Sequence, residues 1–349
     1  MYNSVHPNFK LNGKSFNTNQ LQEVAYSFIK EGKKFERSVG NFLLDWLDTN
    51  GVVVVQTSGS TGVPKRIALK KEQMVNSAMA TGAFFNLPEK SKALLCLSAD
   101  YIAGKMMLVR AMVLGWHLDC VPPSSKISLT TKYQLVAMVP LQVEHSLEDL
   151  NKIETLLIGG AAVSDTLKNK LKDVDTKAYE TFGMTETITH IAARRIGEES
   201  YFKVLPNVSI CTDDRGCLVI HAPKVSDEDI VTNDLVDIPS ASSFAVLGRI
   251  DNVINSGGIK LIPEAIEKRM SGLVSQRFFV AGIPDEQLGQ QLILVVEGNV
   301  NQEDLIHQLK SSGRFTKYEI PKKIIEIPKI LETGSGKINR KATLQAILG

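Results

Sequence analysis

Cysteine is scarce in this chain of 349 residues. The four cysteines, Cys96, Cys120, Cys211 and Cys217, have neither CxxC spacing nor the spacing of a zinc site. Disulfide frameworks and structural zinc sites need paired or clustered cysteines, so neither is expected. Since the sequence also has no signal-peptide pattern at its start, reduced thiols in a cytoplasmic protein are predicted.

An excess of charge of one sign is also absent, as are long hydrophobic runs. Forty Lys and Arg residues against 38 Asp and Glu give a formal charge of +2. No global field therefore favours nucleic acid or an acidic membrane, and no basic face with interleaved aromatics favours nucleic acid locally. The stretch Met106–Trp116 is interrupted by Arg110 and falls far short of the ~20 residues that a membrane span needs. It is interpreted as a buried helix.

The composition that is present favours a globular α/β protein. Hydrophobic residues make up 43% of the chain and charged residues 22%, which is enough for a large core and two domains. Short β-type runs alternate with helical patterns, as in α/β proteins. We expect an N-terminal domain at residues 1–250, of layered α/β sheets with a small β-rich layer. A smaller α+β domain is expected at residues 251–349. The sequence does not determine the oligomeric state.

Local patterns predict individual elements. The run Val52–Val55 is apolar and β-branched throughout, which is typical of a strand covered on both faces. Apolar residues recur at helical spacing in Lys70–Asn86, and Ser164 with Asp165 can cap a helix that runs to about Leu171. Further helices are predicted at Thr18–Lys30, Phe35–Asp48 and Gln302–Ser311, from Pro263, and after Asn339. Further strands are predicted at Leu156–Ile158, Ala178–Phe182, Phe278–Ala281, Gln291–Glu297 and Lys323–Ile327.

The loop Ser58–Lys65, SGSTGVPK, follows the first of these strands. Backbone N–H groups of such a turn converge on an anion, and its hydroxyls and ammonium add charge-assisted hydrogen bonds to phosphate. The loop does not match the usual NTPase motif, because Val63-Pro64 separates the last glycine from Lys65 and a strand follows where that motif runs into a helix. An ordinary surface turn is the alternative.

The segment Tyr179–Glu186, YETFGMTE, combines an aromatic strand end with two oxygen-bearing side chains. A strand that ends in Phe182-Gly183 lets a flat ligand ring meet an aromatic face. Thr185 offers a hydroxyl to a phosphate, and Glu186 offers a carboxylate to Mg²⁺. Taken alone, Glu186 is equally a carboxylate that stabilises a helix start.

Two glycine-containing segments lie nearer the C-terminus. In Glu332–Ile338, an isoleucine replaces the Ser or Thr of a nucleotide loop, so Lys337 is interpreted as a mobile point charge able to swing into an active site. A solvated loop lysine is the alternative. In Gly248–Lys260, Arg249 and a Gly-Gly turn stand where the composition changes. This pattern is compatible with a hinge beside a nucleotide-binding arginine and with a plain interdomain turn.

These four segments, in this order, resemble the motifs of the adenylate-forming superfamily of acyl-CoA synthetases, nonribosomal adenylation domains and luciferases. The matching stretches are Thr57–Lys65, Tyr179–Glu186, Gly248–Gly258 and Gly334–Lys337. Thr232-Asn233-Asp234 resembles the family's T-G-D ribose motif, with asparagine where glycine is usual. Within the superfamily the chain is most similar to the o-succinylbenzoate–CoA ligases of menaquinone biosynthesis, in a form whose segment ahead of the phosphate loop is short.

The resemblance implies an ATP-dependent reaction in two steps. A carboxylate attacks the α-phosphorus of ATP to give acyl-AMP and pyrophosphate, and the thiol of coenzyme A then displaces AMP. Catalytic roles are implied for Lys337, Thr185 and Glu186, with Glu186 on the magnesium ion. The implied ATP-binding residues are Thr57, Ser58, Gly59, Ser60, Thr61, Gly62, Lys65, Gly160, Ala161, Phe182, Gly183, Asp234 and Arg249. Phe182 and the Gly159–Ala161 turn are implied to hold the adenine. The resemblance further implies that residues 1–250 bind ATP and the acyl group and that residues 251–349 form a mobile lid. A hinge at Asp251 would withdraw Lys337 and bring Gly257 and Gly258 toward the thiol.

The expected acid is the aromatic dicarboxylate o-succinylbenzoate. Tyr101, Lys105 and His190 are assigned to the acyl pocket, where Tyr101 stands in place of a family histidine and Arg110 lies near. A dicarboxylate needs cationic or hydrogen-bonding partners away from its reacting end. His190 is equally compatible with a buried core histidine. The alternatives are activation of another aryl acid, loading of a carrier protein, and a non-enzymatic ATP-binding descendant of such enzymes.

Overall fold

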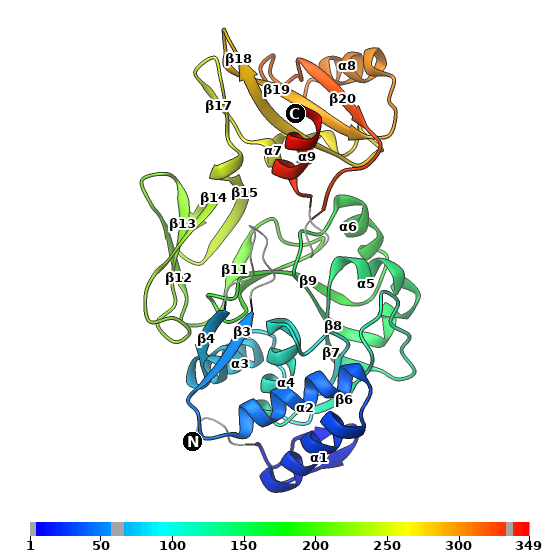
Figure 1. The fold of residues 1–349 in the computed structure, drawn as a ribbon, viewed down its shortest axis with the longest axis vertical. Coiled ribbons are helices and arrows are strands. Elements are labelled where there is room, and N and C mark those ends of the chain that lie inside the picture. Colours follow the sequence, from blue (N-terminus) through cyan, green and yellow to red (C-terminus); the bar gives the residue numbers. More distant parts are fainter. Residues whose placement is uncertain (1–4, 57–65, 333–337, 349) are drawn as a thin grey trace.

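The computed structural model describes residues 5–56, 66–332 and 338–348. Within these ranges the strands form a 13-stranded sheet, a 5-stranded sheet and a separate two-stranded hairpin (Figure 1). The strand order of the large sheet is β12-β13-β14-β15-β11-β10-β9-β8-β7-β5-β6-β1-β2. The order of the 5-stranded sheet is β17-β16-β19-β18, and β20 also pairs with β19.

The large sheet has a parallel half and an antiparallel half. Strands β9, β8, β7, β5, β6 and β1 run parallel, and the β-rich region predicted between Ser200 and Leu247 continues the same sheet in antiparallel pairs through β10. The parallel strands are β1 (Lys10–Leu11), β5 (Lys92–Leu95), β6 (His117–Cys120), β7 (Tyr133–Met138), β8 (Ile153–Ile158) and β9 (Lys177–Gly183). The antiparallel strands are β2 (Lys14–Ser15), β10 (His190–Arg195), β11 (Phe202–Val204), β12 (Ser209–Thr212), β13 (Cys217–His221), β14 (Ile230–Ser240) and β15 (Ser243–Arg249).

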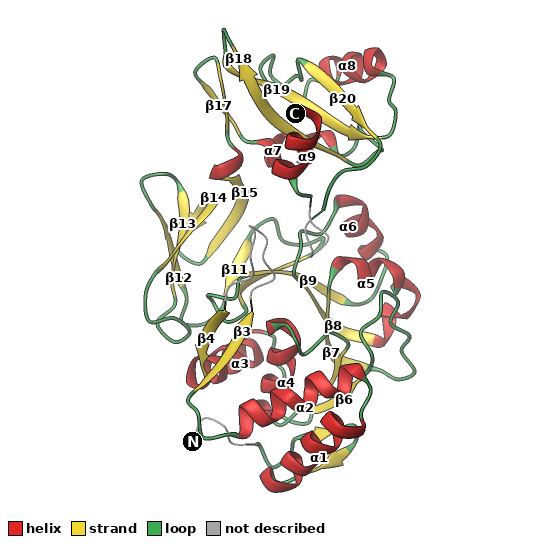
Figure 2. Ribbon diagram, in the orientation of Figure 1, coloured by secondary structure: helices red, strands yellow, loops and turns green. Residues whose placement is uncertain are grey.

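Helices cover both faces of the parallel half (Figure 2). Neighbouring residues of one strand face opposite sides, so Leu135 and Leu157 enter one hydrophobic core while Val136 and Leu156 enter the other. The helices are α1 (Thr18–Glu31), α2 (Lys34–Leu47), α3 (Lys71–Phe84), α4 (Ile102–Leu114), α5 (Pro140–His145) and α6 (Asp165–Leu171), with 3₁₀ turns η1 (Leu147–Lys152) and η2 (Ile250–Asn252). The buried helix predicted around Met106 is α4.

The predicted bounds of α1, α2, α3, α6 and α8 agree with the structure to within one or two residues, whereas α4 begins four residues before the predicted Met106. The Ser164 side chain accepts a hydrogen bond from the backbone N–H of Leu167 at 3.1 Å and thereby caps α6, as predicted. In the described part of the chain, no helix is both long and apolar enough to cross a membrane.

The prediction for the first strand was wrong in one respect. Strand β3 (Val52–Gln56) pairs only with β4 (Arg66–Lys70), in an antiparallel hairpin outside the large sheet. Val53 is 1% exposed, but Val52 is 43% and Val54 is 52% exposed. The run of valines therefore covers one face only. The apolar pattern was misleading because no further strand or helix covers the outer face within the described residues.

A second sheet with its own cores begins after β15. It contains β16 (Ile254–Ser256), β17 (Ile259–Leu261), β18 (Phe278–Asp285), β19 (Gly289–Glu297) and β20 (Lys323–Ile327), with helices α7 (Pro263–Met270), α8 (Gln302–Ser311) and α9 (Arg340–Leu348). Two hydrophobic clusters on the faces of this sheet consist of residues from Ile254 onward. The sheets thus change between Arg249 and Ile254. A domain division near 251 and movement of the second part as a lid stay predictions.

The one-sided burial of β3 can be tested by two matched substitutions. Val53→Ala is expected to lower the free energy of unfolding by about 2 kcal/mol, because it removes buried methyl groups and leaves a cavity. Val54→Ala is expected to change it by no more than about 0.5 kcal/mol, since that side chain is largely exposed. Urea unfolding followed by circular dichroism measures both, and a larger loss for Val54→Ala would contradict the half-buried hairpin.

Candidate active site

The hairpin β3–β4 carries the predicted phosphate loop at its tip. The loop residues Thr57, Ser58, Gly59, Ser60, Thr61, Gly62 and Lys65 lie outside the described residues, and so does Lys337. The strands that flank the loop are antiparallel and pair from Val52–Lys70 to Gln56–Arg66. The continuation of the chain as a strand after the loop is therefore confirmed.

The turn Gly159–Ala161 follows β8 at the carboxyl edge of the parallel strands, where open α/β sheets bind ligands. Gly160 has a φ of +82°, a backbone conformation that residues with a Cβ rarely adopt. A Cβ on Gly159 would lie 2.6 Å from Oγ1 of Thr181. The Thr181 hydroxyl donates a hydrogen bond to the carbonyl oxygen of Ile158 at 3.1 Å. The turn therefore lies directly against β9.

An aromatic cluster adjoins this turn at the end of β9. The ring of Phe182 meets that of Phe244 edge-on at 5.1 Å between centroids, and Phe202 stacks on Phe244 at 5.5 Å. Phe182 is half-buried, whereas Phe202 and Phe244 are buried. The two predicted adenine-binding features, the Gly159–Ala161 turn and Phe182, thus lie at the ends of adjacent strands.

The segment between β9 and β10 is a tight turn that presents Thr185 and Glu186. A Cβ on Gly183 would lie 2.2 Å from the carbonyl oxygen of Thr189, so only glycine permits this approach. Inside the turn the buried Thr187 hydroxyl donates to carbonyl oxygens and accepts from the Met184 N–H at 2.9 Å. Thr185 remains partly exposed and Glu186 exposed. An exposed carboxylate beside a hydroxyl fits a magnesium ion shared with substrate phosphates.

The predicted ribose motif and the predicted hinge are joined by hydrogen bonds. The Arg249 guanidinium donates to Asp234 at 3.3 Å and to Asp251 at 3.0 Å. The Asn233 amide, at the usual glycine position, donates to both oxygens of Asp251 at 3.1 Å and accepts from Arg215 at 3.2 Å. Burial raises the pKa of Asp234, an effect that Arg249 partly offsets, and the hydrogen bond from Arg249 lowers the pKa of Asp251.

A buried cation lies behind the Thr185–Glu186 turn. Arg110, on α4, is 2% exposed and donates to Thr81 Oγ1 at 3.2 Å, Thr189 Oγ1 at 3.3 Å and His190 Nδ1 at 3.4 Å. Its Nη1 contacts only the Met107 sulfur, at 3.8 Å, among the described residues. Burial lowers the pKa of Arg110 to about 9, which leaves the guanidinium charged at neutral pH.

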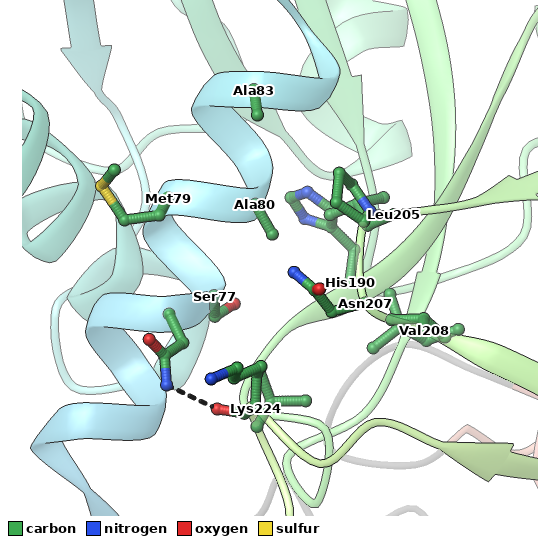
Figure 3. Close-up of a pocket in the computed structure, with 13 residues that line it drawn as sticks. Ser77, Met79, Ala80, Ala83, His190, Leu205, Asn207, Val208 and Lys224 are labelled. Carbon is green, nitrogen blue, oxygen red and sulfur yellow. Dashed lines mark hydrogen bonds between the residues drawn. The ribbon is translucent and has the colours of Figure 1, made fainter.

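His190 is neutral in this cluster. Burial, together with the charge of Arg110, holds the pKa of His190 well below its ordinary value. The Thr81 hydroxyl donates to the Ser77 carbonyl oxygen at 3.0 Å, so its contact of 3.3 Å with His190 Nε2 requires the ring to donate there. The other ring nitrogen, Nδ1, then accepts from Arg110. His190 also lines a cavity of about 260 Å³ between α3 and β10 (Figure 3).

The other two predicted acyl-pocket residues, Tyr101 and Lys105, lie at the start of α4. Tyr101 precedes the helix and is 58% exposed. Lys105 is buried, donates to the Ala99 carbonyl oxygen at 2.7 Å and lines a cavity of about 690 Å³ beneath β3. Burial lowers the pKa of Lys105. The structure thus does not bring Lys105 and His190 into one cavity.

The predicted coenzyme A side is a tight turn between β16 and β17. Gly257 and Gly258 have φ values of +58° and +81°, as a two-residue hairpin turn requires. The N–H of Gly257 donates to the Leu288 carbonyl oxygen at 2.9 Å. Both glycines are exposed.

Comparison with known proteins identifies the family. The sequence model of the family described as AMP-binding enzyme matches residues 24–220. The chain belongs to this family of AMP-binding enzymes. This AMP-binding enzyme has the mixed α/β fold and the AMP-forming acid–CoA ligase class that its motifs predicted.

Two curated relatives of this AMP-binding enzyme are named 2-succinylbenzoate–CoA ligase. That of Listeria monocytogenes serovar 1/2a is 28% identical and covers 91% of this chain and 74% of the relative. That of Lactococcus lactis subsp. lactis is 24% identical and covers 85% and 71%.

Among solved structures, an acyl-CoA synthetase (AMP-forming)/AMP-acid ligase II-like protein from Dyadobacter fermentans is 33% identical, with a TM-score of 0.62 and coverage of 93% of this chain and 98% of that one. The O-succinylbenzoate coenzyme A synthetase of Bacillus subtilis, solved with ATP and magnesium ion, has a TM-score of 0.69 at 19% identity. It covers 83% of this chain and 69% of that one, and its likeness shows the fold.

Three residues that organise this site were not found from the sequence. The buried Glu180 forms an ion pair with the half-buried Arg194 beside the Gly159–Ala161 turn, and Thr187 braces the turn after β9. The signal for Glu180 was a carboxylate in the middle of a predicted strand. Its partner Arg194 is distant in sequence, so the pairing needed the register of β9 and β10.

The close approach at Gly183 yields a direct prediction. Gly183→Ala is expected to lower the melting temperature by several degrees or to prevent folding, because the new methyl group would overlap the Thr189 carbonyl oxygen. Gly51→Ala is the control, since a Cβ there meets no atom within 4 Å. Thermal unfolding of both variants measures the effect, and equal melting temperatures would show that the turn is not constrained as described.

Proposed function

We propose that this AMP-binding enzyme activates o-succinylbenzoate and transfers it to coenzyme A, as in menaquinone biosynthesis. The choice of acid rests on the surroundings of Arg110. Its guanidinium is buried, and no carboxylate of the described residues forms an ion pair with it. A buried charge without a counter-ion is costly, and a second carboxylate on the substrate would supply the counter-ion.

The geometry around Arg110 supports an acid with two carboxylates. Among the described residues Nη1 has only the weak sulfur acceptor of Met107, so its N–H groups could bind a carboxylate. Thr189 is half-buried and connects Arg110 to the turn that presents Thr185 and Glu186. A substrate with two carboxylates could place the reacting carboxylate at that turn. Its second carboxylate, beyond Thr189, could then pair with Arg110.

The ATP roles implied by the motifs form the second part of the proposal. The loop residues Thr57–Lys65 would bind the β- and γ-phosphates, Thr185 the α-phosphate, and Phe182 with the Gly159–Ala161 turn the adenine. Asp234 and Arg249 would bind the ribose hydroxyls. A bound magnesium ion on Glu186 would neutralise phosphate charge. Support comes from the Gly159–Ala161 turn and Phe182, which lie at the ends of the adjacent strands β8 and β9, and from the turn after β9 that presents Thr185 and Glu186.

Lys337 would act in the first step only. A carboxylate oxygen of the acid forms a bond to the α-phosphorus while the bond to the pyrophosphate oxygen breaks, and the ammonium group would stabilise the negative charge of both reactants. The lid, residues 251–349, would then turn about Asp251 and present Gly257 and Gly258 to the thiol. The change of sheet between Arg249 and Ile254 is consistent with a pivot there.

The choice of acid can be measured by pyrophosphate release over a panel of acids. O-succinylbenzoate is expected to exceed its analogue without the ring carboxylate by at least about tenfold in kcat/KM, because a charge-assisted pair with Arg110 is lost. Thioester formation with coenzyme A in the same assay distinguishes it from loading of a carrier protein. A strong preference for a fatty or amino acid would overturn the assignment.

Variants of Arg110 serve as the control for this preference. Arg110→Met should bring the two acids to within about twofold of each other, and Arg110→Lys should keep part of the difference because it retains a charge. Melting temperatures of both variants show whether they fold. An undiminished preference in a folded Arg110→Met protein would show that another group recognises the second carboxylate.

The role of Lys337 is tested by searching for acyl-AMP with mass spectrometry. Lys337→Ala is expected to reduce adenylate formation by several powers of ten, since each tenfold corresponds to ~1.4 kcal/mol of transition-state stabilisation. Release of coenzyme A thioester from chemically supplied acyl-AMP should change far less. Equal acyl-AMP accumulation in the variant and the wild type would exclude the proposed role.

A further inference from the structure

Glu180 is a buried carboxylate in the middle of β9 that the proposed chemistry does not use. Its side chain is 5% exposed, and both of its oxygens are engaged. Oε1 accepts the backbone N–H of Val163 at 3.1 Å. Oε2 accepts Nη2 of Arg194 at 2.6 Å and Nε at 3.0 Å, and it lies 3.6 Å from the Lys168 ammonium.

The first oxygen acts on the turn that would receive adenine. Val163 directly follows the segment Gly159–Ala162 and precedes Ser164, the cap of α6. A hydrogen bond from the Val163 N–H to a charged acceptor fixes the point where the chain leaves this turn. Gly159 and Gly160 have no side chains that could anchor the turn, and the Gly159 N–H donates to the Met138 carbonyl oxygen at 3.2 Å where the turn begins. The bond from Val163 to Glu180 fixes its other end.

The second oxygen acts on the aromatic side of the same site. The Arg194 guanidinium, fixed by Glu180, lies over the ring of Phe202 at 4.4 Å from the centroid. Phe202 stacks on Phe244, and Phe182 lies against both, at 5.9 Å from Phe202 and 5.1 Å from Phe244. The position of Phe182 therefore depends on rings that Arg194 supports.

We infer that Glu180 and Arg194 are positioning residues for the nucleotide: the ion pair between them sets the distance between the Gly159–Ala161 turn and the Phe182 ring. The inference rests on the proposed ATP site. Both side chains bind protein groups, so neither is proposed to contact the nucleotide itself. Their loss should therefore weaken the recognition of adenine while leaving the acid-binding groups and the reacting atoms in place.

Two substitutions break the pair from opposite sides. Glu180→Gln keeps the shape, but its amide can satisfy either Val163 or Arg194 and not both, since one of its two ends is a donor. Arg194→Met removes the guanidinium from Glu180 and from the Phe202 ring. Arg195→Met is the matched control, because this neighbour on the same strand pairs with the exposed Glu198 at 2.9 Å.

The experiment is steady-state kinetics of pyrophosphate release with ATP and magnesium, supported by calorimetric titration of ATP. Glu180→Gln and Arg194→Met are each expected to raise the KM and Kd for ATP about tenfold, with kcat and the KM for the acid changed no more than about threefold. The preference for ATP over GTP should fall in both. Their combination should be little worse than either alone, because both break one link. Arg194→Lys should recover part of the affinity, and Arg195→Met should match the wild type.

The outcomes separate this inference from the proposed function. A purely structural role would lower kcat through loss of folded enzyme and leave the KM for ATP unchanged, and that result would overturn the inference. If Glu180→Gln does not fold, the KM for ATP of Arg194→Met and Arg194→Lys decides the inference in the same way. A wild-type enzyme that releases no pyrophosphate with any acid would instead refute the proposed function.

Discussion

The candidate site depends on one close backbone contact, the approach of Gly183 to the carbonyl of Thr189. This contact folds the segment after β9 back on itself, so that Thr185 and Glu186 project at the edge of the sheet. It also places Thr189 and His190 over Arg110. A side chain at position 183 would push β9 and β10 apart, and Thr185, Glu186 and Thr189 would lose the positions that this turn gives them.

Charge is distributed unevenly around this turn. Arg215, Asn233, Arg249 and the two aspartates form a half-exposed network, in which each individual hydrogen bond contributes little because water competes for the same groups. Glu180, Arg110 and His190 are buried, where the cost of an unpaired polar group is larger, and Arg194 is half-buried. These pairs therefore fix geometry, whereas the exposed network at 251 is weak enough to rearrange, as the proposed hinge would require.

Sequence patterns predicted where helices and strands lie more reliably than which distant segments pack against them. Helical spacing in Lys70–Asn86 and the cap at Ser164 depend on neighbours along the chain, and both predictions were confirmed. The covering of Val52–Val55 depends on which distant segment packs on the strand, and that prediction was wrong. The assignment of Lys105 and His190 to one pocket also depended on how distant segments pack. Lys105, on α4, lines the cavity beneath β3, whereas His190, on β10, lines the cavity beside α3.

The sequence by itself determined the family, the α/β class and the residue types that phosphate, magnesium and carboxylate chemistry require, because these follow from short motifs with fixed spacing. Only the tertiary structure decided that Asn233 binds Asp251, that Arg110 is buried without a carboxylate partner among the described residues, and that Glu180 joins Val163 to Arg194. These contacts connect residues whose proximity is set by strand register and helix packing. No local pattern encodes that proximity, because it arises when the whole sheet assembles.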